Sequence, residues 1–146
     1  MEKLNSIIFY NIDKAIRSYR NYAQRQLKAH GFTITIDQWL IIKAILENPG
    51  ITQNEIGDLV FKDNASVTRI IDLMVKSEYI IRHIHPDDRR KTNLEVTDSG
   101  KKVIKEVQNI VEKNRKAALK GVSKDELEVM YSALLTISEN CLNPKK

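Results

Sequence analysis

The chain has 146 residues, of which 42% are hydrophobic, so it is long enough for one domain with a sizeable core. Its 24 Lys and Arg against 19 Asp and Glu give a net charge of +5, which permits a nucleic-acid partner without requiring one. The single cysteine excludes an internal disulfide, and neither a secretory signal nor a membrane-spanning run of about 18 apolar residues is present. We therefore expect a cytoplasmic protein with no membrane partner.

Helical periodicity dominates the pattern. Apolar residues recur at helical spacing from Leu4 to Leu27, and Gly31 suits the end of that first helix. Three later segments open with a hydroxyl residue followed three positions on by Glu or Gln, the pattern of a capping box. These pairs are Thr35 and Gln38, Thr52 and Glu55, and Ser123 and Glu126. Each pair predicts the start of a helix.

A further helix is predicted after the short segment TQNEIGDLV, with Asp63 as its N-cap. Its apolar residues at i, i+3, i+4 and i+7 form one buried face: Val67, Ile70, Ile71 and Met74. The other side carries small and polar residues early and cations along its length. A short helix, a tight turn and a second helix make a helix-turn-helix.

The spacing of the apolar residues then changes from a period of about 3.6 residues to one of about 2 residues. This change predicts a hairpin formed by YIIRHIH and TNLEVT. A charged loop of about six residues, PDDRRK, would join the two strands, and Thr97 is placed to cap the following helix. The predicted fold is therefore mainly α with a small β wing: a winged helix-turn-helix core flanked by N-terminal and C-terminal helices.

The residue types of the second helix suit the DNA major groove, where such a helix places its N-terminal residues at base edges. Ser66 and Thr68 can donate hydrogen bonds, and Arg69 can reach a phosphate or bind guanine through two hydrogen bonds. The candidate DNA-binding residues of this helix are Asn64, Ser66, Thr68, Arg69 and Lys76. The alternative is an ordinary amphipathic helix with a solvated outer face.

The charged hairpin tip also suits DNA, because a narrow minor groove concentrates negative potential and favours arginine. Arg89, Arg90 and Lys91 would supply the cations, and Asp88 would orient the guanidinium of Arg90. The alternative is a surface ion pair worth about 0–1 kcal/mol with no function.

In this context DDRRKTNLEVTDSGKKV resembles the wing signature of the MarR (multiple antibiotic resistance regulator) family, with Asp88, Arg90, Thr97 and Gly100 among the matches. SVTRIIDLMV resembles its recognition helix, and the likeness spans residues 35–105. It implies a homodimeric transcription regulator, and more specifically a ligand-responsive repressor, that binds a pseudo-palindromic operator on double-stranded DNA. Residues 35–100 would bind DNA, and residues 1–30 and 101–146 would form the dimer.

The chain departs from the family pattern at two positions. Ser77 and Glu78 stand where a glycine often follows the recognition helix, so this helix is expected to end differently. Leu73 stands where a polar or basic residue is commoner, and we expect it to pack locally.

Other functions have weaker support in the sequence. His83 and His85 share a strand face but lack an evident third metal ligand, and Cys141 falls on an apolar stripe that favours a packing role over redox sensing. Trp39, Tyr19 and Tyr22 could line a pocket for a small-molecule effector of unknown identity, although aromatic residues at helical spacing are more often part of a core. No catalytic motif is present, so we expect no enzyme and no cofactor. A winged-helix protein-interaction module is the alternative to a DNA-binding regulator, as is a metal-sensing or redox-sensing variant.

Overall fold

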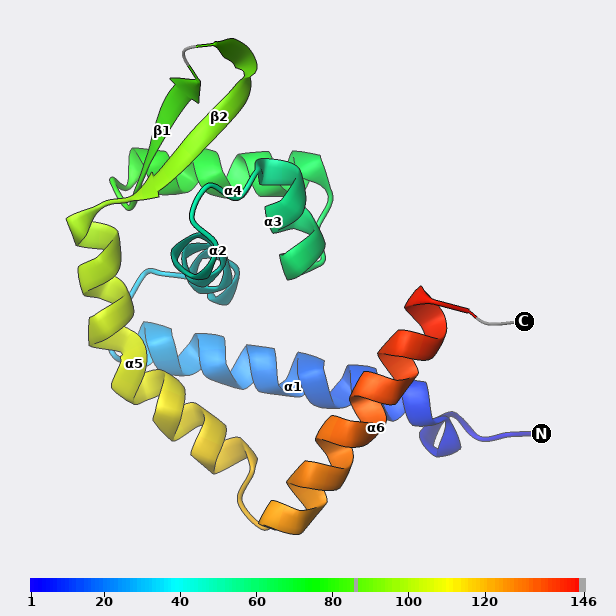
Figure 1. The fold of residues 1–146 in the computed structure, drawn as a ribbon. Helices are drawn as coiled ribbons and strands as arrows, with labels where there is room; N and C mark the ends of the chain where they lie inside the picture. The colour runs from blue at the N-terminus through cyan, green and yellow to red at the C-terminus, as the bar shows by residue number, and fades with distance from the viewer. Residues whose placement is uncertain (86, 145–146) are drawn as a thin grey trace. The chain divides into compact units, whose positions relative to one another are not determined.

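The computed structural model describes residues 1–85 and 87–144, and the side chains of residues 85 and 88–92 lie outside this description. In the described part the fold is mainly α-helical with a two-stranded antiparallel sheet, which confirms the predicted fold class. The elements, shown in Figure 1, are η1 (Leu4–Ser6), α1 (Ile8–Ala29), α2 (Ile36–Glu47), α3 (Gln53–Val60), α4 (Asn64–Lys76), β1 (Ile80–His85), β2 (Asp88–Val96), α5 (Asp98–Ala118) and α6 (Lys124–Leu142).

The predicted helix starts are confirmed by their hydrogen bonds. Thr35, Thr52 and Ser123 each form a complete capping box, in which the side-chain oxygen accepts from the backbone N–H three residues later. The side chain of that later residue in turn bonds to the backbone N–H of the capping residue. Each box satisfies two amide groups that a helix start would leave without a partner, so the local sequence fixes where these helices begin.

The chain forms two compact units, Met1–Asn114 and Arg115–Lys146, and α5 passes from the first into the second. The core of the first unit is built from α2, α3, α4 and the base of the hairpin, with further buried residues from the end of α1 and from α5. Its fully buried side chains are Ile34, Ile41, Ile42, Ile56, Val67, Ile71, Met74, Ile80 and Val107. Branched aliphatic residues supply almost all of this core, and their burial is the main favourable term for folding the unit.

The hairpin is longer than the sequence predicts, because most of the charged segment expected as a loop belongs to β2. Ile80 pairs with Val96 and Ile84 with Thr92, but His85 pairs with Asp88. The three residues between Asp88 and Thr92 therefore have no counterpart on β1, and the strand accommodates them as an irregularity of the bulge type. The prediction of a six-residue loop was wrong because alternation of apolar residues cannot reveal a bulged strand.

At the junction between α4 and the hairpin, Ser77 and Glu78 stand where the family pattern often has a glycine to end the helix. Glu78 lies in the left-handed region with φ of 65°, its N–H donates to the Val75 carbonyl (3.0 Å), and the Tyr79 N–H donates to the Met74 carbonyl (2.9 Å). These two bonds make a Schellman motif, in which glycine is the usual left-handed residue. The helix thus ends in the ordinary way, with Glu78 in the position that favours glycine.

The start of α5 is held against the same junction. The Thr97 hydroxyl donates to the Glu78 carbonyl (2.6 Å) and accepts from the Gly100 N–H (3.0 Å), as expected of a helix cap. A Cβ on Gly100 would lie 2.5 Å from the Tyr79 carbonyl oxygen, closer than real Cβ atoms come. Glycine is therefore required where α5 begins, because only its missing side chain lets the two backbones approach.

The second unit contains α6, which has no buried residue within this chain. Its exposed apolar side chains are Val129, Met130, Tyr131, Leu134, Leu135 and Leu142.

Within the described residues, no helix has the length and apolar character needed to cross a membrane.

Asp63, the N-cap residue of α4, has a lowered pKa. The Oδ1 atom of Asp63 accepts from the Ser66 N–H at 2.8 Å, and this backbone hydrogen bond is the main cause that lowers the pKa of Asp63 below its usual 3.8. The Ser66 hydroxyl and the charge of Arg69 lower the pKa further. Ionised Asp63 therefore stabilises the start of α4.

We predict that Glu78→Gly stabilises the protein by about 0.5–1 kcal/mol, because glycine adopts positive φ without steric cost. The measurement is chemical denaturation at fixed protein concentration. The matched control is Ser77→Gly, since Ser77 has φ of −81° and glycine there brings no relief. Equal effects of the two substitutions would contradict the assignment of strain to Glu78.

We also predict that Asp63→Ala lowers the melting temperature near neutral pH, while Asp63→Asn, which can still cap the helix, lowers it less. A carboxyl with a depressed pKa in the folded state contributes stability above its unfolded pKa and loses it as pH falls through the folded value. The difference between wild type and Asp63→Ala should therefore shrink as the pH falls below about 4. Circular dichroism melts at pH 7 and pH 3 measure it, and a constant difference would refute the prediction.

Candidate nucleic-acid interface

A close backbone approach positions α4 after α3. Gly57 lies on α3, where a Cβ would stand 2.7 Å from the Lys62 carbonyl oxygen, and the Lys62 N–H donates to the Gly57 carbonyl at 2.9 Å. Phe61 closes α3 in the left-handed conformation, with φ of 60°. The two helices are therefore joined by a tight turn, and the start of α4 is fixed relative to α3.

The structure separates the two faces of α4 as the sequence predicts. Val67, Ile71 and Met74 are fully buried. Among the predicted site residues, Ser66 is half-buried and four are exposed: Asn64, Thr68, Arg69 and Lys76. Leu73 does not pack locally, because it is 57% exposed and lies on the outer side of the helix, which corrects our expectation. The outer face thus carries polar and cationic groups and one apolar side chain.

Hydrogen bonds organise the first turns of this face. An Arg69 Nη2 group donates to the Ser66 hydroxyl at 3.3 Å. The Thr68 hydroxyl donates to the Asn64 carbonyl at 2.8 Å and accepts from Gln53 Nε2 at 2.5 Å. The expectation that Thr68 donates to another molecule is not met in this conformation, since its proton is already used. Gln53 was not among the predicted site residues, although its place directly after the capping Thr52 put it at the start of α3.

An ion pair joins the wing to α4. Arg82 on β1 donates to the Asp72 carboxylate at 2.6 Å. Arg82 lies opposite the buried Leu94 in the hairpin, on the strand face that covers the core. The pair compensates an acidic charge on the outer side of α4 and links the hairpin to the helix. Local sequence patterns carry no signal for this ion pair, because the two residues stand on different elements.

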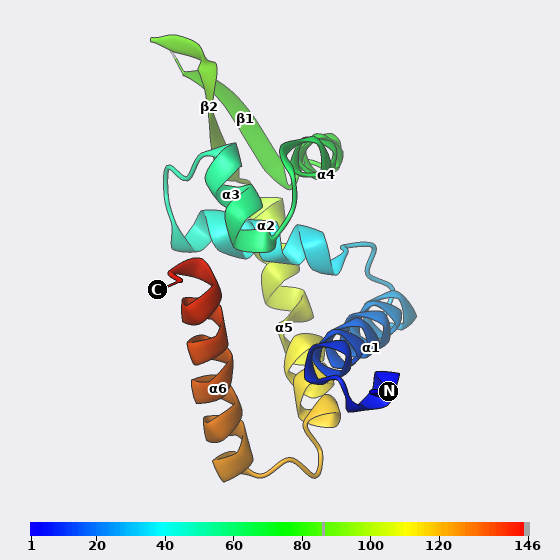
Figure 2. The ribbon, with the colours of Figure 1, turned by 90° about the vertical axis from the view of Figure 1, so that its right-hand side faces the viewer.

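The wing places its cations near the end of the hairpin. Figure 2 shows β1 and β2 extending beyond α2, α3 and α4. The backbone of the segment from Asp88 to Lys91 belongs to β2. The side chains of Asp88, Arg89, Arg90 and Lys91 lie outside the described part of the structure, so the proposed contact between Asp88 and Arg90 stays a prediction.

A second charge cluster connects three elements of the first unit. The Asp37 carboxylate on α2 forms an ion pair with Arg20 of α1 and another with Lys62 in the turn before α4, the latter at 3.3 Å. Gln24 of α1 adds a hydrogen bond from the Ile36 N–H at 3.0 Å. These contacts fasten α1 to the start of α2 and to the turn.

The side chain of His85 lies outside the described part of the structure, so a metal site shared by His83 and His85 stays a prediction. His83 pairs with Glu95 at 2.8 Å across the hairpin, and no group of three or more potential metal ligands is found among the described residues. Cys141 is exposed within this chain, so the expectation of a packing cysteine is not met by the chain's own core.

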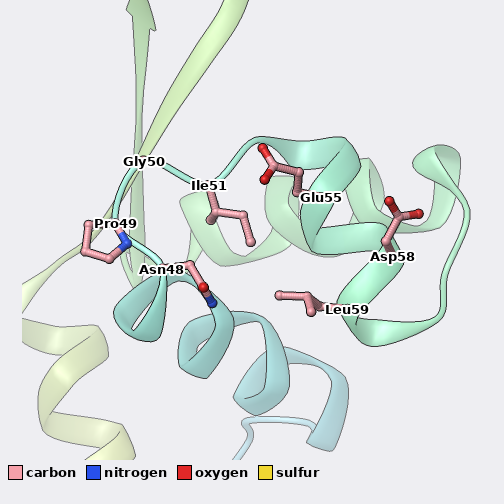
Figure 3. Close-up of a pocket in the computed structure, with 7 residues that line it drawn as sticks. All are labelled: Asn48, Pro49, Gly50, Ile51, Glu55, Asp58 and Leu59. Carbon is pink, nitrogen blue, oxygen red and sulfur yellow. The ribbon is translucent and has the colours of Figure 1, made fainter. Parts of the chain in front are cut away.

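A depression of about 410 Å³ lies beside α3 (Figure 3). It is lined by Asn48, Pro49, Gly50, Ile51, Glu55, Asp58 and Leu59. None of the aromatic residues considered for an effector pocket, Trp39, Tyr19 and Tyr22, lines it. The indole N–H of Trp39 is buried without a hydrogen-bond partner within the described structure. The depression therefore differs from the predicted effector site.

Known proteins share this architecture. Residues 34–92 match the model of the MarR family. A protein of unknown function from Listeria innocua Clip11262 is 30% identical, with 91% of each chain covered and a TM-score of 0.68. The S. aureus MepR–DNA complex has a TM-score of 0.80 at 20% identity, covering 92% of this chain and 98% of that one.

A third structure concerns regulation of DNA binding of Bordetella bronchiseptica BpsR by 6-hydroxynicotinic acid. Its TM-score is 0.84 at 16% identity, with 95% of this chain and 98% of that chain covered. These likenesses establish the fold, and the family match covers the helix-turn-helix and most of the wing. The chain belongs to the MarR family of winged helix-turn-helix transcription regulators.

Proposed function

We propose that the protein is a homodimeric repressor that binds a pseudo-palindromic DNA operator and releases it when a small molecule binds. The observation that carries the proposal is the outer face of α4, which presents Asn64, Arg69 and Lys76 to solvent beside a wing. A helix N-terminus with such residues suits the major groove, and arginines on a wing suit the minor groove. The MepR–DNA complex supports DNA as the partner.

DNA binding requires positive potential at the DNA-binding face itself rather than a large net charge. The net charge of +5 is modest, but Asp72 is paired with Arg82, so it offsets little of the positive potential of Arg69 and Lys76. Phosphate contacts fix the register of such a complex, and base contacts provide sequence preference. The same faces would have no evident use in a protein-interaction module, which remains the alternative function.

The dimer proposal follows from apolar surface that this chain leaves exposed. On α6 several large apolar side chains are exposed, and on α1 so are Ile8, Phe9 and Ile16. Several large apolar side chains exposed on one helix usually mark an interface. A two-fold dimer would place two copies of α4 about one DNA turn apart, roughly 34 Å, which explains why the operator should be a pseudo-palindrome.

Ligand response is proposed by analogy with BpsR, whose DNA binding is regulated by 6-hydroxynicotinic acid. The ion pairs of Asp37 with Arg20 and Lys62 offer a physical route, since they connect α1 to the turn that precedes α4. A ligand that moves α1 would therefore disturb the position of the DNA-binding helix.

The function is tested by selecting bound DNA from a random pool and titrating the selected operator by fluorescence anisotropy. We predict that Arg90→Ala weakens operator binding by about 1–3 kcal/mol without changing the melting temperature. Affinity of the unaltered protein should also fall steeply with salt, since each phosphate contact releases counterions.

The matched control for this titration is Arg17→Ala, which removes the same charge from an exposed position on α1. It should leave operator affinity nearly unchanged. If no sequence is enriched, or if affinity is insensitive to salt, the protein-interaction module becomes the better explanation.

We predict that light scattering at micromolar concentration gives about twice the chain mass of 16.8 kDa. Leu134→Glu combined with Leu135→Glu should lower the measured mass toward that of one chain, because charges would disfavour burial of these side chains. Ser132→Glu, also on α6 and already polar, serves as the control and should leave the mass unchanged. A monomeric mass for the unaltered protein would contradict the dimer.

A further inference from the structure

The hydroxyl proton of Thr68 is already used within the protein. A threonine hydroxyl has one proton to donate, and that proton goes to the Asn64 carbonyl one turn earlier at 2.8 Å. Its oxygen also accepts a hydrogen bond from Gln53 Nε2 at 2.5 Å. The group has no second proton to offer a phosphate or a base, although the side chain is exposed.

Gln53 holds this arrangement from a neighbouring helix. It is the first residue of α3, directly after Thr52, whose capping box with Glu55 fixes the start of that helix. Both helix starts are thus defined, since Asp63 caps α4 by accepting from the Ser66 N–H. The two hydrogen bonds of Thr68 fix its χ1 angle, because Oγ1 must face the Asn64 carbonyl and the Gln53 amide together.

With the hydroxyl proton used and the oxygen fixed, the methyl group of Thr68 is held in one position for an outside partner. In the major groove, the C5-methyl of thymine is the apolar feature that distinguishes bases, and a threonine methyl is suited to contact it. We propose that Thr68 reads a thymine through its methyl group and that Gln53 is the positioning residue that presents this methyl. The inference rests on the proposed function and names a specificity determinant within it.

The test uses operator DNA in which each thymine is replaced, one at a time, by uracil, which removes only the C5-methyl. For wild type, we expect one thymine position in each half-site at which the replacement weakens binding roughly three- to tenfold. Anisotropy titrations of the full-length protein provide the affinities. Melting temperatures of all variants confirm that they are folded.

Two variants separate the parts of the Thr68 side chain. Thr68→Ser keeps the hydroxyl and loses the methyl, so it should bind the thymine and uracil operators equally at that position. Thr68→Val keeps the methyl and loses the hydroxyl, so it should preserve the preference for thymine. Ala65→Gly is the control, since Ala65 is exposed near the start of the same helix and also carries a methyl group.

The role of Gln53 is tested by measuring the same discrimination between thymine and uracil. Gln53→Ala should reduce discrimination between thymine and uracil in the Thr68 protein, because the side chain is then held by one hydrogen bond instead of two. It should have no effect on discrimination in the Thr68→Val protein, in which no hydroxyl needs to be held. A residue with a merely structural role would change both backgrounds alike.

The outcomes are distinguishable. The inference is wrong if wild type binds its operator but no uracil replacement matters, if Thr68→Ser retains the thymine preference, or if Ala65→Gly abolishes it. It is also wrong for Gln53 alone if discrimination survives Gln53→Ala in the Thr68 protein. If wild type binds no selected DNA at all, the proposed function fails, and the inference fails with it.

Discussion

Burial of one face of α4 is the constraint on which the rest of the site depends. Val67, Ile71 and Met74 are fully buried with Ile41, Ile42 and Ile56, so α4 cannot rotate about its axis without exposing apolar surface. Arg69 and Lys76 must then face outward, because they lie on the opposite side of the same helix. The orientation of the polar groups is therefore a consequence of core packing rather than of any contact that they make themselves.

The turn and the wing depend on that helix in different ways. Before α4, the close approach of Gly57 to Lys62 keeps the turn short, and the Asp63 cap fixes the first residue of the helix. After α4, Glu78 ends the helix at positive φ, and Thr97 ties this point to the start of α5. The hairpin that leaves from this junction is thus anchored at its base by backbone contacts.

Two sets of ion pairs link neighbouring elements of this fold. Asp72 is balanced by Arg82 across the gap between helix and wing, and Asp37 is shared between Arg20 and Lys62. Such partly exposed pairs contribute little net stability each, so their value lies in fixing relative positions. The Asp37 cluster is notable because it joins α1 to the turn before α4, whereas the Asp72 pair joins the wing to α4 itself.

The sequence alone determined the helix starts, the two faces of α4 and the family, because capping boxes, helical periodicity and the Asp88–Arg90 spacing are local patterns. It was wrong about the hairpin loop and about Leu73, since a bulge and an exposed apolar residue leave no trace in such patterns. Only the tertiary structure decided that Gln53 engages Thr68 and that Arg82 engages Asp72. The physical reason is that these partners lie on different elements, so their meeting depends on how helices and strands pack around a shared core.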